Sequence, residues 1–303
     1  MGLLDNKVVL VTGAGRGVGR CIALEAAKAG AKVVVNDLGA KEDGTGGEVG
    51  PAQSVVDEII AAGGQAVADT HSIADWDQAQ AIIQTAIETY GQLDGVINNA
   101  GVLRDGIFHK MSEEDFDGLL KINLSGYFYV SRAAAPVFRA QGHGAFVHMS
   151  STSGLIGNFG QANYAAAKLG VVGLSKSIAM DMQRFNVRSN CIAPFAWTRL
   201  VGTIPDATPE EKKRVEGLKK LKPELIAPFA VALLADEAAD VNGQVFGTRA
   251  NEIFLFSQPR PIRSVHTADG WTPQSVVDTA IPALKASFYP LDRSGDVFTW
   301  DPI

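Results

Sequence analysis

Apolar, β-branched runs alternate with amphipathic segments along most of this chain. The run at 7–12 (KVVLVT) precedes a helical pattern at 20–29, and the run at 31–36 (AKVVVN) follows it. Repeated alternation of this kind predicts a parallel sheet with helices on both faces, an α/β doubly wound fold. The last run is either one long strand or a strand pair, and we expect a mostly parallel seven-stranded sheet. The seven expected strands are 7–12, 31–36, 65–70, 93–97, 145–149, 187–193 and 244–256.

Four glycines crowd the turn after the first run, in the pattern G-x-x-x-G-x-G. A turn of this kind lets the backbone approach a pyrophosphate at the amino terminus of a helix, where unpaired N–H groups and the helix dipole favour anions. A plain strand-to-helix turn needs only one or two glycines. The turn therefore predicts a Rossmann-like dinucleotide site, with Gly13, Gly15, Arg16, Gly17, Val18 and Gly19 on the cofactor.

Asp37 ends the second run, about where an acid accepts hydrogen bonds from the adenosine ribose in dinucleotide folds. Its charge would repel a 2′-phosphate, which favours NAD over NADP. Arg16 argues the other way, because a guanidinium in the glycine turn could reach that phosphate. A buried like-charge clash is costly, whereas an arginine on a turn can point away, so we expect NAD.

Two asparagine positions stand out further along. Asn98-Asn99-Ala100-Gly101 ends the strand expected at 93–97, and small and amide residues there can hold the backbone open beside a ligand. Asn123 lies inside a helical pattern between Ile122 and Leu124, an unfavourable place for asparagine. It either faces solvent or has a function.

Ser151, Tyr164 and Lys168 form a candidate proton-transfer group. Ser151 follows the apolar run 145–149, so it lies at the carboxyl end of a strand. Tyr164 and Lys168 are four apart, and on a helix they project from one face. A cation near a phenol lowers the phenol pKa, which brings it closer to a working pH. Tyr-x-x-x-Lys alone is common, so its meaning depends on the rest of the chain.

The chain reads as a single domain over 1–303, without repeats or a linker. Residues 195–222 are irregular and charge-rich, and a segment of this kind after a sheet strand is a candidate substrate lid. From 257 onward the alternation stops. This extension is too short for a domain and too apolar for a disordered tail, so we expect 257–303 to pack on the body or across a subunit interface.

Composition limits the choice of partners. The chain has 303 residues, a formal net charge of −6 and a pI near 5.4, which argues against nucleic acid and anionic membranes. Cys21 and Cys191 are the only cysteines and form neither a disulfide framework nor a zinc site, which favours a cytoplasmic protein. The five histidines lack metal-ligand spacing, and no apolar run approaches the ~18 residues of a membrane span. We expect no metal and a small-molecule substrate.

Taken together, these motifs resemble the short-chain dehydrogenase/reductases over about residues 5–256. The resemblance implies that Tyr164 exchanges the substrate proton, Ser151 binds the substrate oxygen, and Lys168 lowers the Tyr164 pKa and holds the nicotinamide ribose. It implies that Asn123 organises a water that connects Lys168 to solvent. Further cofactor contacts implied are His71, Ser72, Asn99, Ala100, Gly101, Pro194 and Thr198, besides Asp37, Tyr164 and Lys168.

A closer similarity extends over nearly the whole chain. Residues 33–39, 99–105 and 157–164 resemble the (3R)-hydroxyacyl-CoA dehydrogenase unit of type 2 peroxisomal multifunctional enzymes. His71-Ser72 replaces a frequent acid near the adenine, and Phe195 replaces a common glycine. The resemblance implies a homodimer or homotetramer. The predicted substrate contacts are Ser151, Phe159, Gln161, Tyr164, Phe195 and Trp197.

The substrate is left open at this point. Phe159, Phe195 and Trp197 also suit a hydroxysteroid or alicyclic-alcohol dehydrogenase, including one acting on a ring-degradation CoA thioester. A dehydratase or epimerase on the same fold is another enzymatic alternative. A non-catalytic nucleotide-binding sensor is the alternative of a different class.

Overall fold

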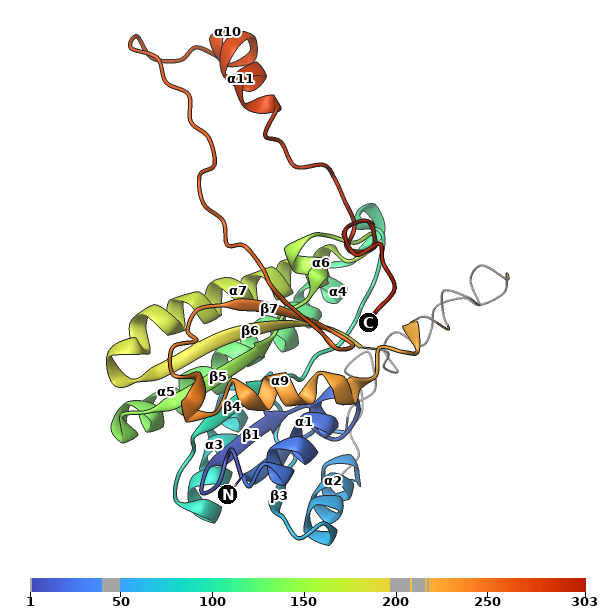
Figure 1. Cartoon of the computed structure of the whole chain (residues 1–303), viewed down its shortest axis with the longest axis vertical. Coiled ribbons are helices and arrows are strands. Elements are labelled where there is room, and N and C mark those ends of the chain that lie inside the picture. The colour runs from blue at the N-terminus through green and yellow to red at the C-terminus, as the bar shows by residue number, and fades with distance from the viewer. Residues whose placement is uncertain (1, 40–49, 197–207, 209–215, 217) are drawn as a thin grey trace.

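An eight-stranded sheet forms the centre of the protein in the computed structural model, which describes residues 2–39, 50–196, 208, 216 and 218–303 (Figure 1). Seven strands are parallel and the eighth is antiparallel to its neighbour. The doubly wound α/β fold is therefore confirmed. In sheet order the strands are β3 (Gln65–Asp69), β2 (Lys32–Asn36), β1 (Val8–Thr12), β4 (Gly95–Asn98), β5 (Gly144–Met149), β6 (Val187–Phe195), β7 (Val245–Arg249) and β8 (Glu252–Leu255).

The extra strand comes from the last apolar run. Ala250 has φ +51°, a left-handed conformation that reverses the chain between β7 and β8. Arg249 then pairs with Glu252 across the hairpin. The run is thus a strand pair, and the described sheet has eight strands where seven were expected.

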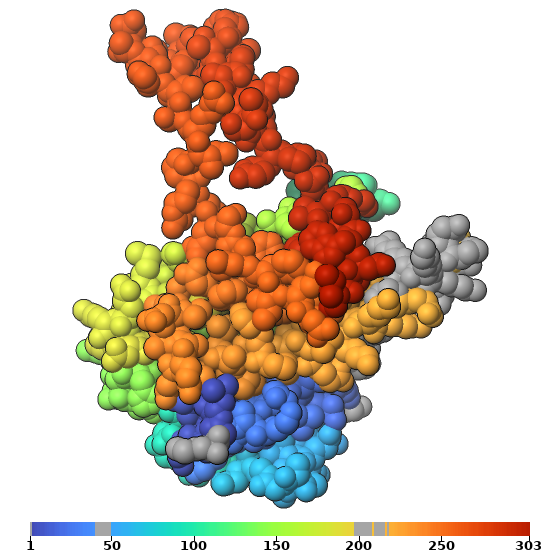
Figure 2. Space-filling model, viewed as in Figure 1, coloured from blue at the N-terminus to red at the C-terminus, as the bar shows by residue number. Residues whose placement is uncertain are grey.

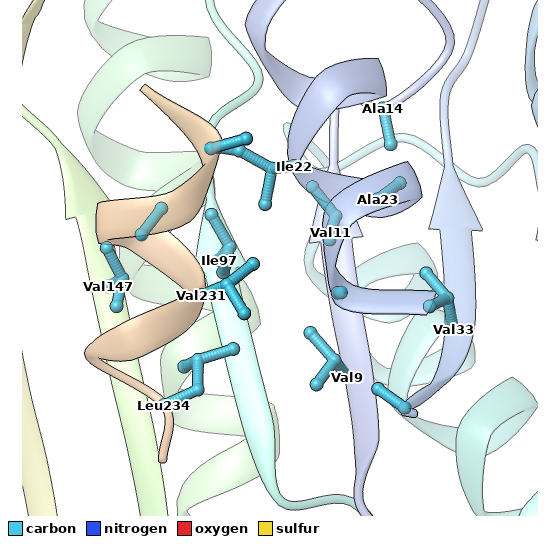
Figure 3. Close-up of a cluster of buried hydrophobic side chains, with 14 of the residues drawn as sticks. Val9, Val11, Ala14, Ile22, Ala23, Val33, Ile97, Val147, Val231 and Leu234 are labelled. Carbon is cyan, nitrogen blue, oxygen red and sulfur yellow. The ribbon is translucent and has the colours of Figure 1, made fainter. Parts of the chain in front are cut away.

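Helices cover both faces of the sheet. Val9 and Val11 of β1 point into one core, with α1 (Gly17–Lys28), α2 (Gly50–Ala61) and α9 (Ala227–Ala232) (Figure 3). Val8 and Leu10 point into the other core. A strand buried on both faces reads as an unbroken apolar run, which explains the pattern in the sequence. The second core is covered by α3 (Trp76–Tyr90), α5 (Gly126–Gln141) and α7 (Ala162–Met182).

The short elements lie mostly at the loops of this frame. At the carboxyl edge of the sheet, α6 (Thr152–Leu155) follows β5, and α4 (Glu113–Leu120) continues through a π-turn, Lys121–Ser125, into α5. π-turns inside helices often mark functional sites. The remaining short elements of the described body are 3₁₀ turns at Phe108–Lys110, Gln183–Phe185, Pro223–Leu225 and Asp236–Ala238.

The C-terminal extension leaves the body after β8 and carries a helical tip that projects from it (Figures 1 and 2). The end of the extension returns to the body: Ser294 N donates to Gly157 O at 3.0 Å, and Asn251 N donates to Ile303 O at 3.0 Å. Its elements are α10 (Pro273–Ser275), a π-turn (Val276–Ala280), α11 (Ile281–Lys285) and α12 (Ser294–Val297).

In the described ranges, every helix is too short or too polar to cross a membrane. The same residues bring together no group of three or more His, Cys, Asp or Glu side chains that could hold a metal ion.

Candidate active site

The glycine turn between β1 and α1 is packed too tightly for side chains. Gly13 has φ +62°, and a Cβ there would meet Ala100 Cα at 2.6 Å. A Cβ on Gly15 would meet Pro51 Cβ at 2.6 Å and the Asp37 carboxylate at 2.8 Å. The turn precedes the amino terminus of the twelve-residue helix α1. This arrangement leaves bare backbone beside a helix amino terminus, which fits a pyrophosphate.

Asp37 lies directly beside this turn. Its Oδ2 accepts from Gly15 N at 2.7 Å and its Oδ1 accepts from Gly39 N at 2.7 Å. Two backbone bonds fix the carboxylate, and its remaining lone pairs can accept from ribose hydroxyls. Arg16 is exposed and sits at the N-cap position of α1 without capping the helix through its side chain. The local geometry therefore fits the adenosine end of a dinucleotide.

The neighbouring strand end is organised by a buried acid. The Asp69 carboxylate contacts His71 Nδ1 at 2.9 Å and accepts from Asn36 Nδ2 at 2.7 Å. Ser72 follows, and its N–H donates to Gln78 at 2.8 Å. His71 and Ser72 thus lie at the carboxyl end of β3, beside the end of β2, as a cofactor contact at the adenine side would require.

Asn99 ties the loop after β4 to the glycine turn. Its Nδ2 donates to both Thr12 O and Gly13 O at 3.0 Å, and Thr12 Oγ1 accepts from the backbone N–H groups of Asn99 and Ala100. The close approach of Ala100 to Gly13 follows from these bonds. The glycine turn and the loop after β4, both predicted to bind the cofactor, are therefore held together by hydrogen bonds.

Asn123 is fully buried in the π-turn and does not face solvent. Its Oδ1 accepts from Val102 N at 2.9 Å and its Nδ2 donates to Val102 O at 3.0 Å. A Cβ on Gly101 would lie 3.4 Å from Asn123 Oδ1. The side chain thus clamps the loop after β4 against the helix. The water-organising role of Asn123 stays a prediction.

Ser151, Tyr164 and Lys168 meet between β5 and α7. Ser151 caps α6 by accepting from Ser153 N at 3.1 Å, and it hydrogen-bonds the Tyr164 hydroxyl. Lys168 Nζ donates to Met149 O at 2.8 Å and lies 5.7 Å from the centroid of the Tyr164 ring. The Tyr164 ring also packs against a small buried cluster that includes Val102. The helical spacing inferred from the sequence is therefore realised.

The protonation states differ from the expectation. Burial raises the pKa of Tyr164 to about 12; the hydrogen bond with Ser151 opposes the rise, and the Asp105 carboxylate adds to it. Burial lowers the pKa of Lys168 to about 7. The net pKa of Tyr164 is thus raised in this structure, and the lowering by Lys168 that the resemblance implies stays a prediction. The physical reason is that the desolvation of the phenolate outweighs the other influences on it, while the ammonium is bonded to Met149.

Two of the predicted substrate contacts lie near the start of α7 and the C-terminal extension. Gln161 Nε2 donates to Asp105 Oδ2 at 2.9 Å, and its Oε1 accepts from Ser153 Oγ at 2.8 Å. Phe159 is 77% exposed, and the Arg293 guanidinium lies 5.7 Å from its ring centroid.

The other predicted contacts lie along β6. Pro194 belongs to β6 and pairs with Thr248 of β7. Phe195 makes an edge contact with Phe298 of the extension, with ring centroids 4.7 Å apart. Trp197 and Thr198 lie outside the described residues, and so does most of the lid expected at 195–222: residues 197–207, 209–215 and 217 are not described.

Sequence reasoning missed three groups around this site. Asp105 influences Tyr164 from the loop after β4. Arg293 reaches Phe159 from a distant part of the chain, and no local pattern reveals it. Tyr127 receives a hydrogen bond from Lys168. Its signal was available, because a residue four positions after Asn123 lies on the same helix face.

Comparison with known proteins identifies the class. Residues 7–203 match the family described as short chain dehydrogenase, which is more than half of the chain. The chain belongs to the short-chain dehydrogenase/reductase family, whose members are NAD(P)-dependent oxidoreductases.

Individual relatives agree with this assignment. A Mycobacterium tuberculosis protein classed as a short-chain type dehydrogenase/reductase is 47% identical over 84% of this chain and 86% of its own length. The peroxisomal multifunctional enzyme type 2 of mouse is 41% identical over 90% of this chain, which spans only 36% of that enzyme. A hydroxyacyl-CoA dehydrogenase of M. tuberculosis is 38% identical over 91% of this chain and 88% of its own length.

A solved structure supports the fold over almost the whole chain. The crystal structure of a short chain dehydrogenase from Mycobacterium avium superposes with a TM-score of 0.83, at 40% identity, over 95% of this chain and 98% of the other.

Proposed function

We propose that this protein is an NAD-dependent dehydrogenase that interconverts a secondary alcohol and a ketone, with a 3-hydroxyacyl-CoA thioester as the substrate. The observation that carries the proposal is the group at the carboxyl edge of β5, where Ser151 hydrogen-bonds the Tyr164 hydroxyl and Lys168 lies beside the same ring. A nicotinamide dinucleotide supplies the hydride acceptor or donor when it is bound.

Tyr164 is the proposed proton acceptor and donor. In alcohol oxidation its phenolate accepts the hydroxyl proton while the carbon-bound hydrogen leaves as hydride; in ketone reduction its hydroxyl returns that proton. Ser151 stabilises the substrate oxygen through its hydroxyl. Because burial holds the Tyr164 pKa at about 12, the ionised form needs a nearby cation, and Lys168 is the candidate. Proton transfer by a positioned side chain typically contributes ~10²–10⁴-fold.

The cofactor preference rests on Asp37. Gly13, Gly15, Arg16, Gly17, Val18 and Gly19 would hold the pyrophosphate, while Asp37 beside Gly15 would accept from the adenosine ribose. A fixed carboxylate at this place disfavours a second phosphate. NAD is therefore the proposed cofactor, and NADP the less favoured one.

The substrate class is supported by the named relatives and by two aromatic side chains. Two relatives are named as a hydroxyacyl-CoA dehydrogenase and a peroxisomal multifunctional enzyme. The aromatic side chains of Phe159 and Phe195, each contacted by the C-terminal extension, also suit a ring substrate, so a hydroxysteroid or alicyclic-alcohol CoA thioester is the second candidate. Gln161 would help position either substrate.

Two further proposals concern the setting of the enzyme. The C-terminal extension exposes apolar side chains, among them Ile262, Phe288 and Leu291, and we propose that it packs against a second copy in a homodimer or homotetramer. Both cysteines are buried free thiols, which suits a reducing cytoplasm. Light scattering and cell fractionation test these two points.

NADH-linked kinetics on 3-hydroxyacyl-CoA, free 3-hydroxy acids and steroid alcohols side by side test the main proposal. The highest kcat/KM is expected for a hydroxyacyl-CoA. A clear preference for a steroid alcohol would favour the second candidate. Turnover without any change in NADH absorbance would indicate an epimerase or dehydratase, and no turnover of any compound would indicate a sensor.

A further inference from the structure

The Lys168 ammonium is almost completely removed from solvent, with 3% of the residue exposed. Two acceptors bind its N–H groups: Met149 O at 2.8 Å and the Tyr127 hydroxyl at 3.1 Å. An ammonium has three N–H donors, so one remains for the site. A buried charge is costly unless it is hydrogen-bonded, and each acceptor therefore matters.

Tyr127 is built into α5 as a fixed partner. It is 0% exposed, and its ring centroid lies 4.7 Å from Lys168 Nζ, which adds a cation–π contact to the hydrogen bond. The ring stacks on His148 with centroids 6.2 Å apart. One turn later, Ser131 Oγ donates to Tyr127 O at 2.7 Å. The ring contact with His148 and the hydrogen bond from Ser131 thus hold Tyr127 with its hydroxyl beside Lys168.

We propose that Tyr127 is a positioning residue for Lys168: its hydroxyl and ring hold the ammonium beside Tyr164, where the proposed proton transfer needs it. This inference rests on the proposed function of Lys168. It adds Tyr127, from α5, to the group formed by Asn123, Ser151, Tyr164 and Lys168.

Among the residues that the structure describes, none forms an ion pair with the Lys168 ammonium. Burial raises the pKa of Tyr127 well above its usual range, so the phenol stays neutral and acts as an acceptor. Burial and Lys168 lower the pKa of His148 to about 3, and burial raises the pKa of Cys191 to about 12. Tyr164 is the fourth titratable group near Lys168, and the Asp105 carboxylate raises the pKa of Tyr164. Dipoles and rings around Lys168 therefore offset only part of the cost of burying its charge.

The direct test is the titration of Lys168 in the full-length protein without cofactor. Tyr127→Phe keeps the ring and removes only the hydroxyl acceptor. Hydrogen bonds to charged groups are the stronger kind, so we expect the Lys168 pKa, followed by ¹³Cε NMR and assigned with Lys168→Met, to fall by about one unit, a tenfold loss of proton affinity. Tyr127→Leu, which also removes the ring, should shift it further.

A matched control lies two residues along the same helix. Lys121 Nζ donates to the Tyr129 hydroxyl at 3.0 Å and lies 4.9 Å from its ring centroid, in a more exposed place. Tyr129→Phe should therefore leave the Lys168 titration unchanged. An unchanged Lys168 pKa in both Tyr127 variants would overturn the inference, whatever happens to their thermal stability.

A kinetic readout separates positioning from a merely structural role. The Lys168 pKa is about 7 in the wild type and is expected to be roughly 6 in Tyr127→Phe. If activity requires the Lys168 ammonium, kcat/KM of the two proteins should agree within about twofold at pH 6 and differ about tenfold at pH 8.5. A deficit that is equal at every pH would contradict this. If no compound is turned over at all, the proposed function fails, while the NMR titration still decides the role of Tyr127.

Discussion

Replacing the carboxylate at Asp37 tests how the fold chooses its cofactor. Asp37→Asn is nearly isosteric and keeps an oxygen for the Gly15 N–H group, which Asp37 now binds at 2.7 Å. The variant removes the charge and little else. We therefore expect only a modest loss of NAD affinity, about tenfold or less, because a charge-assisted hydrogen bond becomes a neutral one.

The effect on NADP follows from Coulomb's law. Two unit charges ~5 Å apart at an effective dielectric of about 20 interact by roughly 3 kcal/mol, which corresponds to about 10²-fold in affinity. Removing the Asp37 charge removes this repulsion of the 2′-phosphate. The ratio of kcat/KM for NAD to that for NADP should therefore fall roughly 10²-fold in Asp37→Asn.

The assay is steady-state kinetics with both cofactors at a fixed substrate concentration. Asp94→Asn is the matched control, because Asp94 Oδ2 also accepts a backbone N–H, from Val8 at 2.7 Å, but lies at the opposite edge of the sheet. It should lower the melting temperature without changing the ratio. A wild type that prefers NADP, or an unchanged ratio in Asp37→Asn, would refute the reasoning.

Three further predictions concern other parts of the site. The folded-state pKa of Lys168, about 7, lies below its unfolded value near 10.4, so the unfolded chain binds more protons above pH 7 and the free energy of unfolding rises with pH. Lys168→Met lacks this contribution, so in urea unfolding its stability relative to wild type should fall by about 2 kcal/mol between pH 7.5 and 9. A difference that stays constant with pH would contradict this prediction. Gly13→Ala places a Cβ 2.6 Å from Ala100 Cα at a left-handed φ, so fluorescence titration should show NAD binding at least ~10-fold weaker; unchanged binding would show that the turn does not hold the cofactor. Gln161→Ala removes the hydrogen bond to Asp105. We expect KM for the substrate to rise about 3- to 10-fold with kcat nearly unchanged. A fall in kcat alone would contradict a role of Gln161 in substrate binding.

Much of the fold could be predicted because its strands are buried on both faces. Val8 to Val11 alternate between two cores, so every position in the run is apolar. The glycine turn was equally legible, since the contacts at Gly13 leave no room for a Cβ. The hairpin between β7 and β8 could not be predicted, because an alanine in the left-handed conformation, here Ala250, carries no sequence signal of a turn.

The electrostatics of the site could not be predicted from spacing. The i, i+4 relation of Tyr164 and Lys168 was right, but the sign of the Tyr164 pKa shift depends on burial, which is a property of the tertiary structure. The contacts of Arg293 and Phe298 with the substrate side join residues more than a hundred positions apart. Only the folded chain brings such pairs together.

The most direct test of the account is the turnover of Tyr164→Phe, measured as NADH formation from the best 3-hydroxyacyl-CoA. The variant keeps the ring that packs beside Val102 and loses only the hydroxyl bound by Ser151. Tyr90→Phe, at the end of α3, is the control. The account predicts that kcat falls at least ~10²-fold in Tyr164→Phe with NAD binding retained, and an unchanged kcat would contradict it.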